Sequence, residues 1–139
     1  MKSADLIVFT NGCFDIIHAG HIHLLKQAKS MGAKLIVGLN SDLSVSRLKG
    51  PSRPINNQAD RLLVLNSIRY VDQVIIFDQD DPMDLIMKIN PNVLVKGSDY
   101  KKKNIIGADF VIANGGSVRI VDFVDGKSSS NIIKRLDDQ

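Results

Sequence analysis

Short apolar runs rich in β-branched residues alternate along this chain with segments whose apolar residues recur at helical spacing. The apolar runs predict β-strands at Leu6–Thr10, Leu35–Leu39, Val74–Phe77, Val93–Val95 and Val118–Val121. The segments between and after them predict helices at His21–Met31, Gln58–Tyr70, Asp81–Ile89, Ile105–Ala113 and Ser128–Leu136. Strands that are apolar on both faces and alternate with helices are typical of a parallel sheet covered on two sides. The sequence therefore predicts an α/β fold, a single doubly wound parallel sheet of about five strands.

The composition limits what kind of protein this can be. The chain has 139 residues, 44% apolar and 24% charged, which fits one globular domain spanning 1–139. A net charge of +3 is too small to indicate nucleic-acid binding, and no apolar run approaches the roughly 18 residues of a membrane span. The single cysteine, Cys13, fits a reducing compartment. We therefore expect a cytoplasmic protein that has neither nucleic acid nor a membrane as its partner.

Glycines, hydroxyls and ionisable residues follow the predicted strands at their carboxyl ends. They occur in Asn11–His21, Asn40–Asp42, Lys96–Tyr100 and Asp125–Ser130. In a doubly wound sheet, ligands bind beyond these ends, at the point where the strand order reverses. The stretches Asn40–Asn57 and Gly97–Asn104 are predicted to be long irregular loops, which in a compact domain are usually functional. This distribution indicates a site for an anionic ligand.

His18-Ala19-Gly20-His21 is the most informative motif in the sequence. Gly20 lacks a side chain at the expected helix start, so a phosphate could approach the backbone N–H groups and the positive end of the helix dipole. His18 and His21 could donate hydrogen bonds to that phosphate. They could equally be partly buried histidines that cap the turn. A metal site made of Cys13, His18 and His21 is disfavoured, because the spacing matches no common zinc module.

A second group of small and basic residues is predicted to complete the site. Ser128, Ser129 and Ser130 at a helix start would cradle the distal phosphates of a nucleotide, although capping alone would explain Ser128. Arg61 lies on the apolar stripe of its helix and either snorkels to solvent or reaches the site. Arg47 and Arg53 are each expected to be solvated loop residues.

The pattern Gly-x-Phe-Asp-x-x-His-x-Gly-His, here Gly12–His21, resembles that of the cytidylyltransferase-like nucleotidyltransferases, which have a Rossmann-like fold. Further matches are Arg61, Arg69–Val74 and Ser128–Ile133, so that the resemblance runs from about Ile7 to Leu136. Within the family, the heptose 1-phosphate adenylyltransferases are the most similar branch. The segments that resemble this branch are Arg47–Gly50, Ser52–Pro54, Leu94–Tyr100 and Asn114–Gly116. Phe123 stands where the glycerol-phosphate branch has arginine.

The resemblance implies transfer of AMP from ATP to D-glycero-D-manno-heptose 1-phosphate, giving ADP-heptose and pyrophosphate for lipopolysaccharide core synthesis. It also implies Mg²⁺ that bridges the phosphates, a homodimer, and a separate kinase chain that supplies the sugar 1-phosphate. The alternatives are the same chemistry on another acceptor, such as FMN or a phosphorylated alcohol with CTP, and a nucleotide-sensing module without turnover.

The site residues that we expect fall into three groups. The catalytic group is His18, His21 and Lys49. The nucleotide-binding group is Thr10, Asn11, Gly12, Phe14, Gly20, Gly97, Asp99, Ser128, Ser129 and Ser130. The group expected to bind the acceptor is Asp15, Asn40, Asp42 and Arg61. No residue is assigned as a dedicated metal ligand.

Overall fold

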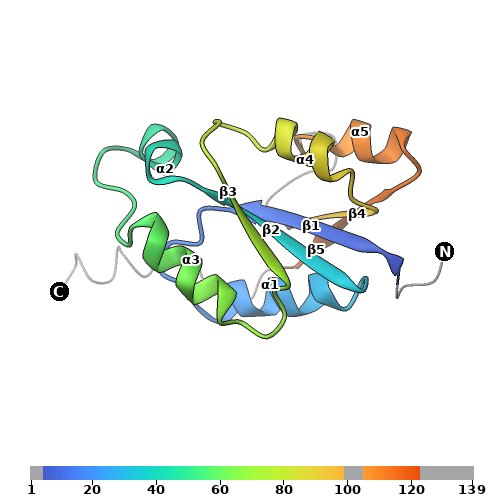
Figure 1. Cartoon of the computed structure of the whole chain (residues 1–139), viewed down its shortest axis with the longest axis horizontal. Helices are drawn as coiled ribbons and strands as arrows, with labels where there is room; N and C mark the ends of the chain where they lie inside the picture. Colours follow the sequence, from blue (N-terminus) through green and yellow to red (C-terminus); the bar gives the residue numbers. More distant parts are fainter. Residues whose placement is uncertain (1–4, 99–104, 123–139) are drawn as a thin grey trace.

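The computed structural model describes residues 5–98 and 105–122, which form a five-stranded parallel sheet between two layers of helices (Figure 1). The strands are β1 (Ile7–Gly12), β2 (Lys34–Asn40), β3 (Gln73–Phe77), β4 (Val93–Gly97) and β5 (Ser117–Val121). Their order in the sheet is β3-β2-β1-β4-β5. The order reverses between β1 and β4, and this is the switch point of a doubly wound sheet. The predicted fold class is confirmed.

Two apolar clusters hold the helices against the sheet. The helices are α1 (Ala19–Lys29), α2 (Asp42–Lys49), α3 (Gln58–Asn66), α4 (Met83–Ile89) and α5 (Ala108–Ala113). On one face, Leu25 of α1 and Leu65 of α3 pack against the strands. On the other, Ile86 of α4 and Val111 of α5 do the same (Figure 1). All four side chains are fully buried, and each such burial stabilises the fold by about 1.5–3 kcal/mol.

The structure corrects the predicted loop at Asn40–Asn57, because α2 occupies part of it. The signals for this helix are present in the sequence. Ser41 is the N-cap and accepts a hydrogen bond from the Ser44 N–H, and Gly50 ends the helix with a φ of 106°. A left-handed residue after the last turn favours glycine. The exposed Leu43 and Leu48 leave this helix without a clear apolar stripe, which is why periodicity does not reveal it.

Several helix boundaries also differ from the prediction. α1 spans Ala19–Lys29 instead of His21–Met31, and α5 begins at Ala108 instead of Ile105. The helix expected to run to Tyr70 ends at Asn66, where Ser67 caps it and its N–H bonds back to the Leu63 carbonyl. Pro82 is the N-cap of α4 rather than its first residue. Asp81 nevertheless stabilises this start as expected, because its carboxylate accepts a hydrogen bond from the Met83 N–H at 2.9 Å.

Among the described residues, no helix is long and apolar enough to cross a bilayer. The helix predicted at Ser128–Leu136 and most of the loop predicted at Gly97–Asn104 lie outside the described residues.

Candidate active site

The loop between β1 and α1 lies at the switch point of the sheet. β1 pairs with β2 on one side and with β4 on the other, so that this loop starts at the centre of the carboxyl edge. We expect Asn11 and Gly12 to follow the first strand; in the structure they are the last two residues of β1. The predicted gathering of the β1, β2 and β4 ends at one edge is confirmed by the topology.

The two imidazoles of the motif are fixed by hydrogen bonds to the start of α1. His18 is the N-cap, and its Nδ1 accepts from the Gly20 N–H at 3.0 Å. The His21 Nδ1 accepts from the His18 N–H at 3.1 Å. The ring centroids are 4.1 Å apart. Because each Nδ1 is an acceptor, each neutral ring carries its proton on Nε2. Capping therefore uses Nδ1 and leaves the proton of each neutral ring on Nε2, and the Nε2 atom of His18 is buried in this structure.

Burial, and then the neighbouring His18, lower the pKa of His21 to about 4. His21 is consequently neutral at pH 7. An imidazole in this state interacts with a phosphate as a hydrogen-bond donor rather than as a cation, so that positive charge must come from other residues.

The missing side chain of Gly20 is expected to let a phosphate approach the backbone N–H groups of this helix start. In the structure, the Gly20 N–H donates to the His18 imidazole at 3.0 Å. A side chain at the N-cap commonly reaches the backbone N–H groups of the first helical turn. The role of Gly20 in binding a nucleotide stays a prediction.

Two residues of the turn before His18 have a positive φ, which is uncommon for residues other than glycine. Phe14 has a φ of 48° and Ile16 a φ of 56°. A β-branched residue in the left-handed region costs of order 1–3 kcal/mol, and such residues cluster at functional sites. Phe14 is buried, and its ring lies 5.5 Å from the His21 ring. A Cβ at Gly12 would lie 3.1 Å from the Phe14 ring, which is why glycine suits this position.

Asp15 joins this turn to the segment before α3. Its carboxylate is buried and accepts hydrogen bonds from the N–H groups of Ile55 and Asn56, at 2.7 and 2.9 Å, and from Arg53 Nε at 3.1 Å. Burial works against ionisation, but these hydrogen bonds outweigh it and hold the pKa of Asp15 below its usual value. The expectation that Arg53 is solvated is wrong, because its side chain is 12% exposed and paired with Asp15.

Arg61 binds four segments of the chain together. Its guanidinium donates to the carbonyl groups of Asn56, Cys13 and Asn40, at 2.9, 2.7 and 2.8 Å. It also donates to Asp42 Oδ1 at 2.8 Å. The side chain is 1% exposed, so it does not snorkel to solvent. These hydrogen bonds shape the loops at the carboxyl edge of the sheet, and contact of Arg61 with the acceptor stays a prediction.

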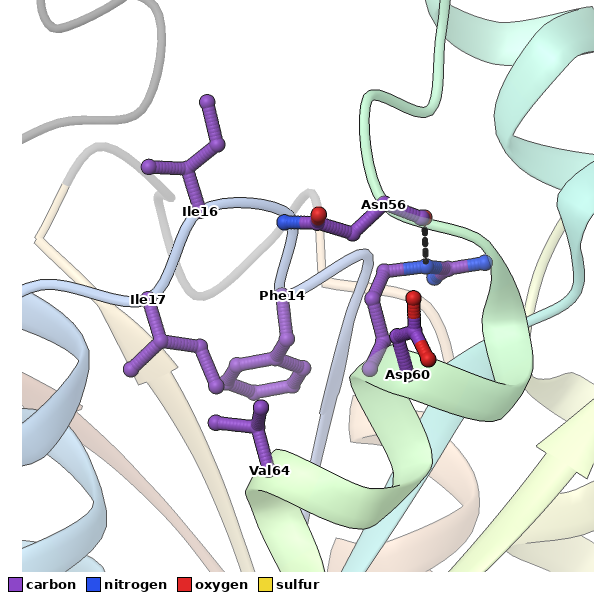
Figure 2. Close-up of a pocket in the computed structure, with 7 residues that line it drawn as sticks. Phe14, Ile16, Ile17, Asn56, Asp60 and Val64 are labelled. Carbon is purple, nitrogen blue, oxygen red and sulfur yellow. Dashed lines mark hydrogen bonds between the residues drawn. The ribbon is translucent and has the colours of Figure 1, made fainter.

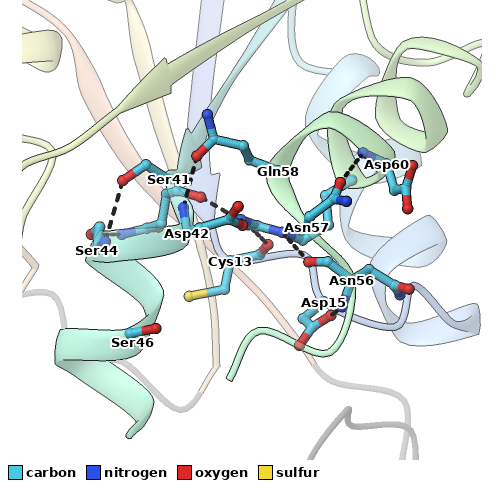
Figure 3. Close-up of polar contacts among 12 residues, drawn as sticks. Cys13, Asp15, Ser41, Asp42, Ser44, Ser46, Asn56, Asn57, Gln58 and Asp60 are labelled. Carbon is cyan, nitrogen blue, oxygen red and sulfur yellow. Dashed lines mark hydrogen bonds and ion pairs between the residues drawn. The ribbon is translucent and has the colours of Figure 1, made fainter. Parts of the chain in front are cut away.

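The residues around Asp42 are tied into the same network (Figure 3). The Asp42 N–H donates to Gln58 Oε1 at 2.9 Å, which joins α2 to α3. The Asn40 carboxamide donates to Ser44 Oγ at 3.0 Å. Asn40 and Asp42 are the residues expected to contact the acceptor. The structure shows Asn40 buried and Asp42 partly exposed, with one carboxylate oxygen bound to Arg61.

Lys96, which the sequence places at the carboxyl end of a strand without indicating a role, is a buried cation. It lies on β4, is 7% exposed, and donates through Nζ to the Asn11 carbonyl and carboxamide oxygens. The available signal is a lysine that directly continues the apolar run Val93–Val95. The neighbouring Thr10 is fully buried, and its hydroxyl donates to the Val95 carbonyl at 2.8 Å. Thr10 thus links β1 to β4.

Three cationic side chains act on Cys13, just after the end of β1, and two of them, Arg53 and Arg61, are paired with carboxylates. Burial raises the pKa of the Cys13 thiol, while the charges of Lys49, Arg61 and Arg53 lower it. All three cations are therefore near Cys13. Lys49 ends α2 and is exposed, so that its ammonium is accessible to a ligand. Arg47 is also exposed, as expected, and pairs with Asp80.

Within residues 5–98 and 105–122, no three His, Cys, Asp or Glu side chains are placed to hold a metal ion. The carboxylates of Asp15 and Asp42 are engaged by arginines. Gly97 is the last residue of β4, whereas Asp99, Ser128, Ser129 and Ser130 lie outside the described residues.

Relatives of this chain include longer proteins. It is 56% identical over 137 residues to the Bifunctional protein HldE of Campylobacter concisus (strain 13826), covering 99% of this chain and 28% of that protein. The corresponding protein of Wolinella succinogenes is 53% identical over 130 residues, covering 94% of this chain and 27% of that protein. The chain thus spans less than three tenths of these curated relatives.

Solved structures show the same fold. The lipopolysaccharide core biosynthesis protein from Thermoplasma volcanium matches with a TM-score of 0.67 and 30% identity, over 86% of this chain and 96% of that one. Pantothenate synthetase from Thermus thermophilus matches with a TM-score of 0.63 and 16% identity, over 92% of this chain and 61% of that one, and shares the fold. The sequence profile of the cytidylyltransferase-like family matches residues 9–135. That match, with the Gly12–His21 motif at the switch point of the sheet, shows that this chain belongs to the cytidylyltransferase-like family.

Proposed function

We propose that this chain transfers AMP from ATP to D-glycero-D-manno-heptose 1-phosphate, giving ADP-heptose and pyrophosphate. The observation that carries the proposal is the His18–His21 pair, whose two Nδ1 atoms are held by backbone N–H groups so that both Nε2 atoms are donors. The similarity to HldE proteins and to a lipopolysaccharide core biosynthesis protein supports the choice of acceptor.

The proposed reaction needs no general base, because the nucleophile is already an anion. A phosphate oxygen of the sugar 1-phosphate attacks the α-phosphorus of ATP. The bond between that phosphorus and the oxygen that bridges it to the β-phosphorus breaks. Pyrophosphate leaves with the electron pair. The protein must hold two polyanions in line and stabilise the charge that builds on the transferred group. His18 and His21 would donate hydrogen bonds to it, and Lys49 would supply positive charge.

Mg²⁺ would assist by neutralising the nucleotide phosphates. The described residues do not form a protein site for it, since no trio of suitable side chains gathers there and the Asp15 carboxylate is held by Arg53 and two N–H groups. In our proposal, the phosphate oxygens of the nucleotide therefore hold the ion, and no residue is assigned to it.

The source of the acceptor and the oligomeric state form the remaining parts of the proposal. Relatives such as the Campylobacter concisus protein are named bifunctional, and this chain matches 28% of that protein. We infer that a kinase activity supplies the sugar 1-phosphate to this site. Whether that activity belongs to a separate chain, and whether this chain forms a homodimer, can be tested by copurification and by light scattering.

A matrix of nucleotides and acceptors tests the proposed reaction. ATP and CTP are each combined with heptose 1-phosphate, FMN and glycerol 3-phosphate, and pyrophosphate release and product mass are measured. We expect ADP-heptose from ATP and heptose 1-phosphate as the fastest reaction. Faster formation of FAD or of a CDP-alcohol would move the chain to another branch. Tight ATP binding without pyrophosphate release from any acceptor would identify a nucleotide sensor.

A further inference from the structure

We propose that the pocket between the Phe14–Ile17 turn and α3 binds the hydroxyl-bearing part of the acceptor, and that Asp60 and Asn56 select it. This inference rests on the proposed function and deepens it. The pocket is open to solvent, has a volume of about 110 Å³, and is lined by Phe14, Ile16, Ile17, Asn56, Asp60, Arg61 and Val64 (Figure 2).

The position of the pocket relates it to the reacting groups. Ile16 and Ile17 belong to the turn that leads directly into His18, and the ring of Phe14 is 5.5 Å from that of His21. Phe14 therefore both lines the pocket and contacts the His21 ring, which links the pocket to the imidazoles expected to bind the transferred phosphate. The pocket is also held in shape from both sides, because Asp15 ties the turn to the backbone of Ile55 and Asn56.

The polar groups of the pocket suit hydroxyls and disfavour phosphate. Asp60 is an exposed carboxylate in the first turn of α3, and no described residue forms an ion pair with it. The Arg61 guanidinium lines the pocket but is bound to Asp42 and to three carbonyl groups. Because the Arg61 guanidinium is engaged and the Asp60 carboxylate is exposed, the described lining of the pocket would repel a phosphate. The phosphate end of the acceptor must then point toward the histidines.

The apolar lining completes the match to a sugar. Figure 2 shows the Phe14 ring beside Ile17 and Val64, with Asn56 and Asp60 presented from the α3 side. Val64 is 46% exposed, so this apolar wall is accessible to a ligand. A polyol has an apolar C–H surface for such a wall and hydroxyls for a carboxylate and a carboxamide. The class of ligand is thus a neutral, hydroxylated carbon chain attached to a phosphate.

Acceptor discrimination tests this assignment. The values of kcat/KM are measured for heptose 1-phosphate and for mannose 1-phosphate, which has a shorter hydroxylated arm, with wild type, Asp60→Ala and Asn56→Ala. We expect wild type to prefer the heptose, and Asp60→Ala to reduce that preference roughly 10-fold or more through the lost charged hydrogen bond. Asn56→Ala should act in the same direction and more weakly. The KM for ATP should stay unchanged.

A matched control separates recognition from helix stability. Asp84 is the exposed acidic residue in the first turn of α4, as Asp60 is in α3. Asp84→Ala should leave the preference unchanged. Suppose that wild type turns over heptose 1-phosphate. If Asp60→Ala then keeps the preference for the heptose, or gains kcat/KM because the carboxylate had repelled the acceptor, the pocket assignment is wrong. The proposed function stands in both cases. If wild type accepts no sugar 1-phosphate at all, both fall.

Discussion

At the scale of single residues, the histidine pair carries the reaction proposed for this chain. Removing one donor to a developing charge typically lowers kcat by about 10²–10³, or about 2.7–4 kcal/mol. We expect losses of this size for His18→Ala and for His21→Ala, measured as pyrophosphate release. His23→Ala, two residues further along α1 than His21, should stay near wild type. Turnover of folded His18→Ala or His21→Ala within a few-fold of wild type would remove the pair from the mechanism.

The protonation state of His21 gives a second residue-scale prediction. Its folded-state pKa is about 4 because of burial and the neighbouring His18, whereas the unfolded chain has an ordinary value near ~6.5. Between these values the unfolded state binds a proton that the folded state does not. The contribution of His21 to the free energy of unfolding is therefore fully present above about pH 6.5 and is lost as the pH falls toward 4. Urea unfolding across this range should show a steeper loss for wild type than for His21→Gln. Equal slopes would contradict the low pKa.

Lys96 allows a test of how the Asn11 side chain is held. We expect Lys96→Met to fold, because methionine has a similar length and a buried charge is replaced by an apolar group. The Asn11 carboxamide would then lose its donor. If Asn11 contacts the nucleotide, as predicted, the KM for ATP should rise by about 10-fold, and the free energy of unfolding should fall by about 1–3 kcal/mol because the Asn11 oxygens lose their donor. Lys88→Met on the exposed side of α4 serves as the control. An unchanged KM would limit Lys96 to a structural role.

At the scale of elements, the loops at the carboxyl edge depend on one side chain from α3. Arg61→Met would leave the carbonyl groups of Cys13, Asn40 and Asn56 without their donor. Removing one partner of such a buried charged network costs about 3–5 kcal/mol of unfolding free energy. Arg61→Lys cannot reproduce the planar fork and should recover only part of this. Urea unfolding measures both, with the exposed Arg47→Met as a control expected to lie within about 0.5 kcal/mol of wild type.

The difference between buried and exposed apolar residues explains which elements can be predicted from the sequence. The strands are recognisable because they are buried on both faces and therefore read as continuous apolar runs. The helix α2 escapes prediction because Leu43 and Leu48 are exposed on it, which hides the periodicity. For the site, the positions of His18 and His21 follow from a local motif. The pairing of Asp15 with Arg53 does not, because it joins residues 38 apart through a turn whose geometry no local pattern encodes.

At the scale of the whole molecule, the proposal requires residues far apart in the sequence to bind one triphosphate. The imidazoles follow β1, and the serines at 128–130 follow β5, the strand at the other side of β4. Because all five strands are parallel, their carboxyl ends share one edge. The proposal is that one nucleotide spans from the switch point along this edge and is bound by both segments.

Hydrogen exchange measures this directly. A non-hydrolysable ATP analogue is added to the full chain, and exchange is followed by mass spectrometry in peptides that contain His18–His21 and the serines at 128–130. Because one ligand would hold both segments, we expect them to gain protection together, with the same dependence on analogue concentration. Peptides that cover residues 29–34, which join the end of α1 to the start of β2 at the amino edge of the sheet, should not change. His18→Ala, which weakens the site at one end, should reduce protection at the serines as well. Protection of only one segment, or two different binding curves, would show that they do not share a ligand.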